Sequence, residues 1–177
     1  MKYFAVQVRT LKEDAYIARV NDRLQFRSEK QRFFFPKRKL TIRRLGKKSD
    51  EIRPVFPGYL FLETDEIDPE LFGIMRSTKD FGRFLKNNKD ITPIEGRDLA
   101  LLQHFLRFGQ IADTSVVTFN ENDRICVKSG PLQGLEGFVV KVDKRKQRAK
   151  ISLDFANENF VIDLAFNILE EKGDDEL

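Results

Sequence analysis

The chain has little of what secreted, membrane and metal-binding proteins usually need. Its 177 residues include one cysteine, Cys126, and one histidine, His104. A single cysteine excludes a disulfide within the chain and provides no cysteine cluster for a metal, so we expect Cys126 to be a small core residue. No apolar run approaches the roughly 18 residues that span a membrane, and the polar N-terminus does not resemble a signal peptide. We therefore expect a cytoplasmic protein without membrane contact, metal or other cofactor.

Catalytic motifs are equally scarce. His104 falls in a helix-like segment, where a surface or boundary position is more common than the role of a general base. No Ser/His/Asp or Cys/His set can be assembled around it. The glycines at 130, 134 and 137 lack the lysine that follows the glycines of a phosphate-binding loop. The sequence therefore predicts a protein that is not an enzyme.

Positive charge is distributed unevenly along the chain. Residues 1–112 contain 23 Lys and Arg against 15 Asp and Glu, whereas residues 113–177 contain 9 against 13. Nine basic residues and no acidic one lie between Lys30 and Lys48. A second basic cluster interrupts the acidic C-terminal part and consists of Lys141, Lys144, Arg145, Lys146, Arg148 and Lys150. Both clusters are typical of surfaces that bind polyanions, although a solvated hairpin or turn would show the same pattern.

Hydrophobic periodicity predicts an α+β domain in the N-terminal part. We expect strands at residues 3–8, 33–44, 50–64 and 81–85, with a turn at Gly46, and helices at residues 11–25, 68–75 and 95–108. Asp68 is the expected N-cap of the second helix and Pro69 its first helical residue. This order predicts an antiparallel sheet covered by helices.

The C-terminal part has the short alternating runs and glycine turns of a small β-barrel. We expect strands at residues 116–119, 123–128, 136–143, 149–155 and 159–164, with residues 168–169 closing the barrel. The residues expected to face its core include Ile125, Val127, Phe138, Val140 and Val142. The predicted organisation is a domain at 1–110, a linker at 111–116, a second domain at 117–172 and an acidic tail at 173–177.

Several motifs, in this order, resemble the NusG family of transcription elongation factors. The run Val55-Phe-Pro-Gly-Tyr-Leu-Phe-Leu62 is similar to a strand of the family's N-terminal domain, called NGN. The glycine-containing run from Arg124 to Asp143 is similar to its KOW module. The resemblance covers residues 2–108 and 116–171. It implies an NGN domain, a linker and an SH3-like KOW β-barrel, in a monomer whose main partner is RNA polymerase.

The resemblance also implies roles for individual residues. The positions matching Phe56, Pro57, Gly58 and Tyr59 form the family's apolar docking surface for RNA polymerase. The residues alone leave open whether Phe56 and Tyr59 are interface or core. A second surface, toward the polymerase cleft and the non-template DNA strand, is expected to include Arg76, Ser77, Thr78 and Lys79, together with Arg43, Arg44, Lys47 and Lys48. The common family pattern has a proline or small residue where Lys79 and Asp80 stand.

Three features are more similar to specialised paralogues of the LoaP and RfaH kind than to a housekeeping NusG. They are the segment 36–40 with its long basic hairpin, the run 55–62 and the basic stretch 141–150. The last of these most resembles LoaP. In LoaP-like KOW modules such a stretch holds an RNA hairpin. The implied RNA-binding residues are Lys144, Arg145, Lys146, Arg148 and Lys150. Phe155 matches the position that contacts a ribosomal protein or termination factor, or it is barrel core.

The implied function is transcription elongation with antitermination or pause suppression, the KOW module recruiting nascent RNA or a protein partner. Two alternatives remain open from the sequence. The first is a general housekeeping NusG that acts in termination and transcription-translation coupling. The second, of a different class, is a ribosome-associated RNA-binding KOW protein.

Overall fold

The structure is a computed structural model that describes residues 1–27 and 31–169. Lys30 and the predicted acidic tail at 173–177 lie outside these residues. The chain forms two compact units. Unit 1 comprises Met1–Pro36 and Pro54–Gln103, and unit 2 comprises Lys37–Arg53 and His104–Leu177. Each unit is thus assembled from two separate stretches of the chain.

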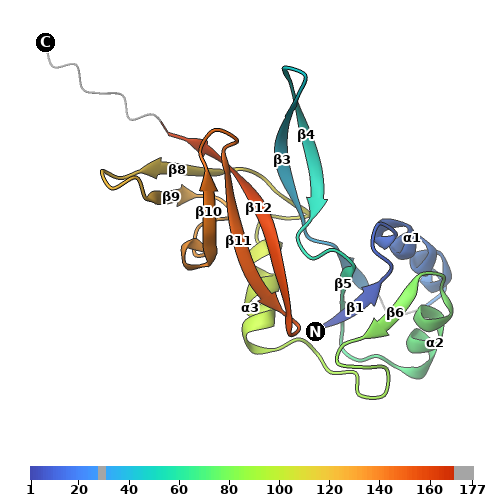
Figure 1. Cartoon of the computed structure of the whole chain (residues 1–177). Helices are drawn as coiled ribbons and strands as arrows, with labels where there is room; N and C mark the ends of the chain where they lie inside the picture. Colours follow the sequence, from blue (N-terminus) through green and yellow to red (C-terminus); the bar gives the residue numbers. More distant parts are fainter. Residues whose placement is uncertain (28–30, 170–177) are drawn as a thin grey trace, which may run out of the picture. The chain divides into compact units, whose positions relative to one another are not determined.

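Unit 1 is an antiparallel four-stranded sheet in the order β2-β5-β1-β6, with helices packed against it (Figure 1). Its strands are β1 (Lys2–Val8), β2 (Arg32–Phe34), β5 (Tyr59–Thr64) and β6 (Phe81–Phe84). Its helices are α1 (Glu13–Leu24) and α2 (Pro69–Ser77), and α3 (Gly96–Leu106) begins in this unit. Alternate strand residues and one stripe of each of α1 and α2 form the core, which includes Val6, Tyr16, Val20, Leu60, Leu71 and Met75.

The start of α2 shows how local sequence fixes an element. The Asp68 carboxylate accepts the Leu71 N–H at 2.8 Å, and Pro69 occupies the first turn, where no N–H is needed. Arg27 forms salt bridges with Asp68 and Glu70 and holds the pKa of Asp68 below its ordinary value. The predicted N-cap is confirmed.

Unit 2 contains a β-hairpin and a five-stranded β domain. The hairpin strands β3 (Lys37–Arg44) and β4 (Lys47–Pro54) form a sheet with the short β7 (Ile111–Ala112), which runs parallel to β3. The β domain has the strand order β10-β11-β12-β8-β9. Its elements are β8 (Ser115–Phe119), β9 (Ile125–Ser129), η1 (Glu136–Phe138), β10 (Val139–Asp143), β11 (Arg148–Phe155) and β12 (Glu158–Ile168).

Two turns in unit 2 depend on backbone conformations that glycine favours. At the hairpin tip, Leu45 and Gly46 have φ of 50° and 77°, as a tight two-residue hairpin turn requires. Gly130 has φ of 93°, and a Cβ there would lie 2.6 Å from the Cα of Ser115. The predicted turn at Gly46 is confirmed. From the sequence, the glycines at 130, 134 and 137 are all expected to allow tight backbone paths. This is confirmed at Gly130 but not at Gly134 or Gly137, where a Cβ would meet nothing within 4 Å.

The structure corrects four of the expected elements. The strand expected at residues 33–44 is two strands, because β2 ends at Phe34, β3 begins at Lys37, and the two belong to different sheets. The strand expected at residues 50–64 is two strands, because a turn at residues 55–58 separates β4 from β5. The hairpin β3-β4 does not join the sheet of unit 1; β4 has few buried side chains and therefore no apolar face to pack against that sheet. Residues 136–138 form a short 3₁₀ turn rather than the start of a strand.

A β-bulge overturns part of the predicted barrel core. The register between β10 and β11 shifts between Val139 and Lys141, so neighbouring side chains change faces. As a result Val140 is 60% exposed, although alternation placed it inside. Phe138, also expected inside, lies in the 3₁₀ turn that precedes β10 and is 47% exposed. The core consists instead of residues such as Val117, Ile151, Leu153, Phe155, Leu164 and Phe166.

The predicted α+β class is confirmed, with an antiparallel sheet under helices and a separate small β domain. Residues 111–116, expected as a linker, contain β7 and the first residues of β8. Within residues 1–27 and 31–169, no helix is long and apolar enough to cross a membrane. The same residues contain no group of three or more His, Cys, Asp or Glu side chains arranged to hold a metal ion.

Candidate nucleic-acid interface

The basic hairpin is anchored to the β domain of unit 2 through buried arginine contacts. Arg38 is 7% exposed, and its Nε–H donates to the Asp163 carbonyl at 2.7 Å. Burial lowers the pKa of Arg38 to about 10, so it remains a cation at neutral pH. In return, Arg148 Nη2 donates to the Thr41 carbonyl at 2.9 Å. The first contact joins a hairpin side chain to the β12 backbone, and the second joins a β11 side chain to the hairpin backbone. Together they fix the hairpin to the β domain.

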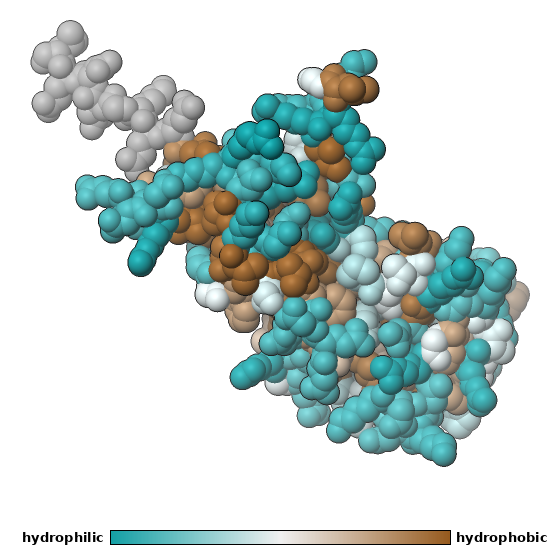
Figure 2. Space-filling model, in the orientation of Figure 1, coloured by the Kyte–Doolittle hydropathy of each residue, from teal (hydrophilic) through white to brown (hydrophobic). Residues whose placement is uncertain are grey.

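Beyond this anchor, the basic side chains of the hairpin are exposed to solvent. Arg43, Arg44, Lys47 and Lys48 are all exposed, and Figure 2 shows a mostly hydrophilic hairpin surface. The exceptions are Leu45 at the tip, whose side chain is fully exposed, and Ile52 on β4, which is partly exposed. Lys39, nearer the base, forms salt bridges with Asp50 at 3.2 Å and Asp113 at 3.5 Å.

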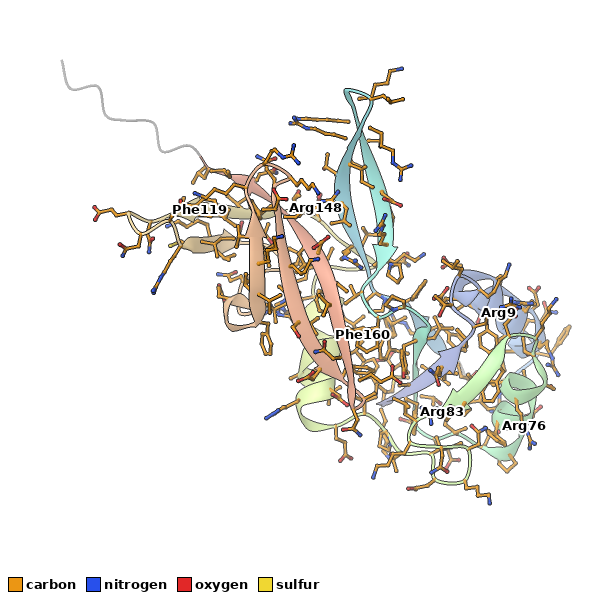
Figure 3. All side chains as sticks on the ribbon, viewed as in Figure 1. Arg9, Arg76, Arg83, Phe119, Arg148 and Phe160 are labelled. Atoms are coloured by element: carbon orange, nitrogen blue, oxygen red, sulfur yellow. The ribbon has the colours of Figure 1, made fainter. Side chains whose placement is uncertain are left out.

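The second basic segment forms the turn between β10 and β11. Asp143 accepts the Lys146 N–H at 2.9 Å, which lowers the pKa of Asp143, and the charges of Lys146 and Arg145 lower it further. Gln147 completes the turn with φ of 52°. The turn thereby places Arg145 and Lys146 in solvent. Arg148 is half-buried and lies beside the hairpin (Figure 3).

Two of the predicted RNA-binding lysines have acidic side chains nearby. Lys144 forms a salt bridge with Asp123, and its Nζ lies 4.0 Å from the centre of the Phe119 ring. Lys150 is exposed and lines a smaller depression, which it shares with Lys146, Arg148 and the carboxylates of Asp143 and Asp163.

Six basic residues, three from each of the two segments, meet in one place. A cleft of about 450 Å³ lies between the hairpin and the β domain within unit 2. The basic residues that line this cleft, called here the basic cleft, are Arg43, Arg44, Lys48, Arg145, Lys146 and Arg148. Lys47 and Lys144 are not part of its lining, although they belong to the same two segments. The structure thus brings together side chains that the sequence assigned to separate DNA and RNA surfaces.

The segment 56–59 of unit 1, called here the aromatic segment, is mostly buried. Phe56 and Tyr59 are each 1% exposed, and the rings of Phe56 and Phe61 meet edge to face with centroids 5.8 Å apart. Pro57 is the exposed residue of the four. In this structure the two predicted anchor rings therefore present no surface to a partner, and their docking role stays a prediction.

A buried carboxylate that sequence reasoning missed supports this segment. Glu13 is 4% exposed, and its Oε1 accepts the Gly58 N–H at 2.9 Å. Gly58 has φ of 82°, and its carbonyl accepts the Val8 N–H at 2.8 Å. Glu13 lies 45 residues away in the first turn of α1, where an acidic residue is ordinary. No local signal in the sequence distinguishes it.

In the segment 76–79 at the end of α2, two of the four predicted donors are available to a partner. The hydroxyls of Ser77 and Thr78 donate to the carbonyls of Gly73 and Ile74, each at 2.7 Å. Thr78 is buried, whereas Arg76 and Lys79 are exposed. Figure 3 shows Arg76 on α2, and its guanidinium lies 5.9 Å from the centre of the Phe72 ring. Arg76 and Lys79 are thus the residues of this segment free to meet a phosphate.

Asp80 holds the end of this segment in place. Its carboxylate accepts a hydrogen bond from Arg19 Nη2 at 2.7 Å, which lowers the pKa of Asp80. Its backbone has φ of 76°, and its carbonyl accepts the Arg9 N–H at 2.9 Å. The residue that departs from the family pattern therefore has a structural role in this chain.

The other residues singled out from the sequence lie in or near the core of unit 2. Phe155 is fully buried at the end of β11, so core packing describes its place in this structure. His104 has the predicted boundary position in α3: Nε2–H donates to the Pro131 carbonyl at 2.7 Å, and Arg107 donates to Nδ1 at 3.0 Å. Cys126 is partly buried in β9.

Comparison with known proteins agrees with this architecture. Residues 1–103 match the family model described as "Transcription termination factor nusG". Curated relatives include the transcription termination/antitermination protein NusG of Borreliella burgdorferi, 24% identical over 135 residues, covering 72% of this chain and 73% of the relative. The protein of the same name from Thermus thermophilus is 25% identical and covers 71% and 72%.

Among solved structures, one titled "Domain interaction in Thermotoga maritima NusG" has a similar fold. Its TM-score is 0.58 at 18% sequence identity, and the alignment covers 93% of each chain. The family match spans more than half of this chain and includes the segment with Phe56 and Tyr59. The chain belongs to the NusG family.

Proposed function

We propose that this chain is a non-enzymatic transcription factor that binds RNA polymerase and suppresses pausing or termination, with unit 2 contacting nucleic acid. The observation that carries the proposal is the exposed basic surface of unit 2. Its cations lie on the hairpin and on the β10–β11 turn, and they include Arg44 and Lys146. Such a surface supplies the sequence-independent attraction to phosphate on which nucleic-acid binding depends.

The specialised, LoaP-like role rests on the same surface. The β domain belongs to a stretch of negative net charge, so a local basic cluster there opposes the sign of its surroundings. Exposed cations on a turn suit backbone contacts to an RNA stem, which is recognised mainly by shape and phosphates. We propose that the protein is cytoplasmic and works as a monomer alongside the non-template DNA strand and nascent RNA.

A transcription assay with purified RNA polymerase tests the proposal. The full-length chain is added to elongation complexes on a template with a pause and a terminator, with and without a structured leader RNA sequence upstream. We expect co-purification with polymerase and increased read-through, larger on the leader template. Failure to bind polymerase would contradict the proposed function.

A second candidate is the general NusG role, in which the β domain recruits a protein such as a ribosomal protein or termination factor. Two observations favour it: the curated relatives are named termination/antitermination proteins, and Val140 and Val161 expose 60% and 55% of their area on the β domain. Equal read-through with and without the leader, combined with increased termination when a termination factor is added, would support this candidate instead.

A further inference from the structure

The contacts that hold the walls of the basic cleft together involve only one of the six cleft cations. The Arg38 bond to the Asp163 carbonyl and the pairing of β3 with β7 hold the hairpin against the β domain. Arg148 contributes one nitrogen to this anchor through the Thr41 carbonyl. The remaining cleft cations have no part in it. Since the two walls are tied together by backbone and buried groups, the cleft is a defined feature of unit 2.

Among the described residues, five of the six cleft cations form no salt bridge, in contrast to basic residues just outside the cleft. The lining of the cleft contains no Asp or Glu. In the part of the chain that the structure describes, Arg43, Arg44, Lys48, Arg145 and Lys146 form no salt bridge. By comparison, Lys39 pairs with Asp50 and Asp113, and Lys144 pairs with Asp123.

Arg148 provides a second indication that the cleft binds an anion, because one of its donors has no acceptor in the described part of the chain. Its Nη1 lies 3.9 Å from the Asp163 carboxylate, a weak ion pair. Its Nε is buried and has no hydrogen-bond partner among the described residues. A buried donor without an acceptor costs free energy. Converging like charges also repel one another, and a bound anion relieves that repulsion.

We propose that the basic cleft is one phosphate-binding site, in which the hairpin and the β10–β11 turn hold the same phosphodiester backbone between them. The inference deepens the proposed function and rests on it for the class of ligand. Four of the six cations are arginines, whose planar guanidinium matches two phosphate oxygens at once. A volume of about 450 Å³ lies in the range of sites that enclose a ligand larger than a single phosphate. The hairpin and the turn therefore act on one nucleic acid rather than on separate DNA and RNA ligands.

The experiment uses the full-length chain and measures fluorescence anisotropy with a labelled RNA duplex and a DNA duplex of the same sequence, each of about 16 base pairs. One variant removes two hairpin charges from the cleft, Arg44→Gln with Lys48→Gln. A second removes two from the turn, Arg145→Gln with Lys146→Gln. The matched control, Lys47→Gln with Lys144→Gln, removes one charge from each segment outside the cleft lining. Unchanged melting temperatures show that each variant is folded.

Each cleft variant is expected to lower the affinity of the same one-to-one complex by about tenfold or more and to reduce the slope of log affinity against log salt by roughly two. The control should leave that slope nearly unchanged. Comparing the RNA and DNA arms identifies which backbone the cleft prefers. The inference is wrong if only one cleft variant weakens binding, if the control weakens it equally, or if neither duplex binds. Polymerase pull-downs with the same proteins separate this failure from failure of the proposed function, because polymerase binding would then persist without nucleic-acid binding.

Discussion

In unit 1, the rings of Phe56 and Tyr59 are packed away from solvent, whereas in unit 2 the charged ends of Arg44 and Lys146 lie exposed around a cleft. The difference follows from the chemistry of the side chains. An aromatic ring gains free energy by leaving water, whether it enters its own core or a partner's groove. A cation is almost never buried without a partner, so a dense run of cations marks surface more reliably than a run of aromatics marks an interface.

The comparison also separates two ways of positioning a site. The aromatic segment is held by Glu13, which is buried and bonds to the Gly58 N–H. The basic cleft is held at its base by Arg38, and the cations of its lining other than Arg148 form no salt bridge among the described residues. Substitutions in unit 1 should therefore act mainly on folding, whereas substitutions in the cleft should act mainly on binding.

The largest expected effect is that of Phe56→Ala on stability. Removing a buried phenylalanine ring leaves a cavity, so the free energy of unfolding should fall by about 3–5 kcal/mol. Pro57→Ala, at the exposed neighbour, is the control and should change stability little. Urea unfolding followed by circular dichroism measures both. A loss below about 1 kcal/mol together with weaker polymerase binding would show that the ring is an interface anchor instead.

The parts of the fold that the sequence predicts are mostly those with local causes. The N-cap at Asp68 and the turn at Gly46 each depend on residues that lie together in the chain. Gly130 is the exception, because its close approach is to Ser115 in β8. The failures come from long-range effects. The prediction for the face of Val140 is wrong because a bulge against β11 shifts the register, and the prediction for Phe138 is wrong because residues 136–138 form a 3₁₀ turn. Alternation alone reveals neither feature.

The candidate site was predictable as a charge pattern but not as a shape. Sequence alone locates Arg44 and Lys146 in basic stretches roughly a hundred residues apart in a chain of 177 residues, with nothing to indicate that they line one cleft. Nor can it tell Lys144 from Lys146, because the partner of Lys144 is Asp123 on a separate loop. Tertiary structure makes that distinction by pairing one lysine and leaving its neighbour exposed.

The second prediction tests the anchor of the cleft with Arg38→Met, which removes no cation from the cleft lining. Losing a buried hydrogen bond from a charged group should lower stability by about 1–3 kcal/mol. The hairpin should also lose its fixed position, so duplex affinity should fall. Arg124→Met, which removes an exposed arginine of unit 2, is the control. If Arg38→Met weakens stability but leaves duplex affinity intact, the cleft does not depend on this anchor.

The third prediction concerns the two exposed cations at the end of α2. Arg76→Ala combined with Lys79→Ala should lower pause suppression by about two- to fivefold, since exposed charge contacts are each worth about 0.2–1 kcal/mol. Polymerase binding should persist, and single-round transcription at a defined pause site gives the readout. Ser77→Ala is the control, because that hydroxyl donates to the Gly73 carbonyl. Wild-type pausing by the double variant would remove this segment from the proposed DNA contact.

The smallest expected effect concerns His104, whose ring is neither fully buried nor fully exposed. Burial lowers the pKa of His104 below its ordinary value of 6.5, and the Arg107 charge acts in the same direction. As pH falls below that value, the unfolded chain binds the proton more readily than the folded chain, so His104 contributes a loss of stability on acidification. The effect is small because water still reaches the ring. Urea unfolding between pH 7.5 and the acid side of 6.5 should therefore show a slightly steeper loss for wild type than for His104→Gln, which keeps a donor for the Pro131 carbonyl. An equal or shallower loss in the wild type would mean that the histidine is not held in its neutral form.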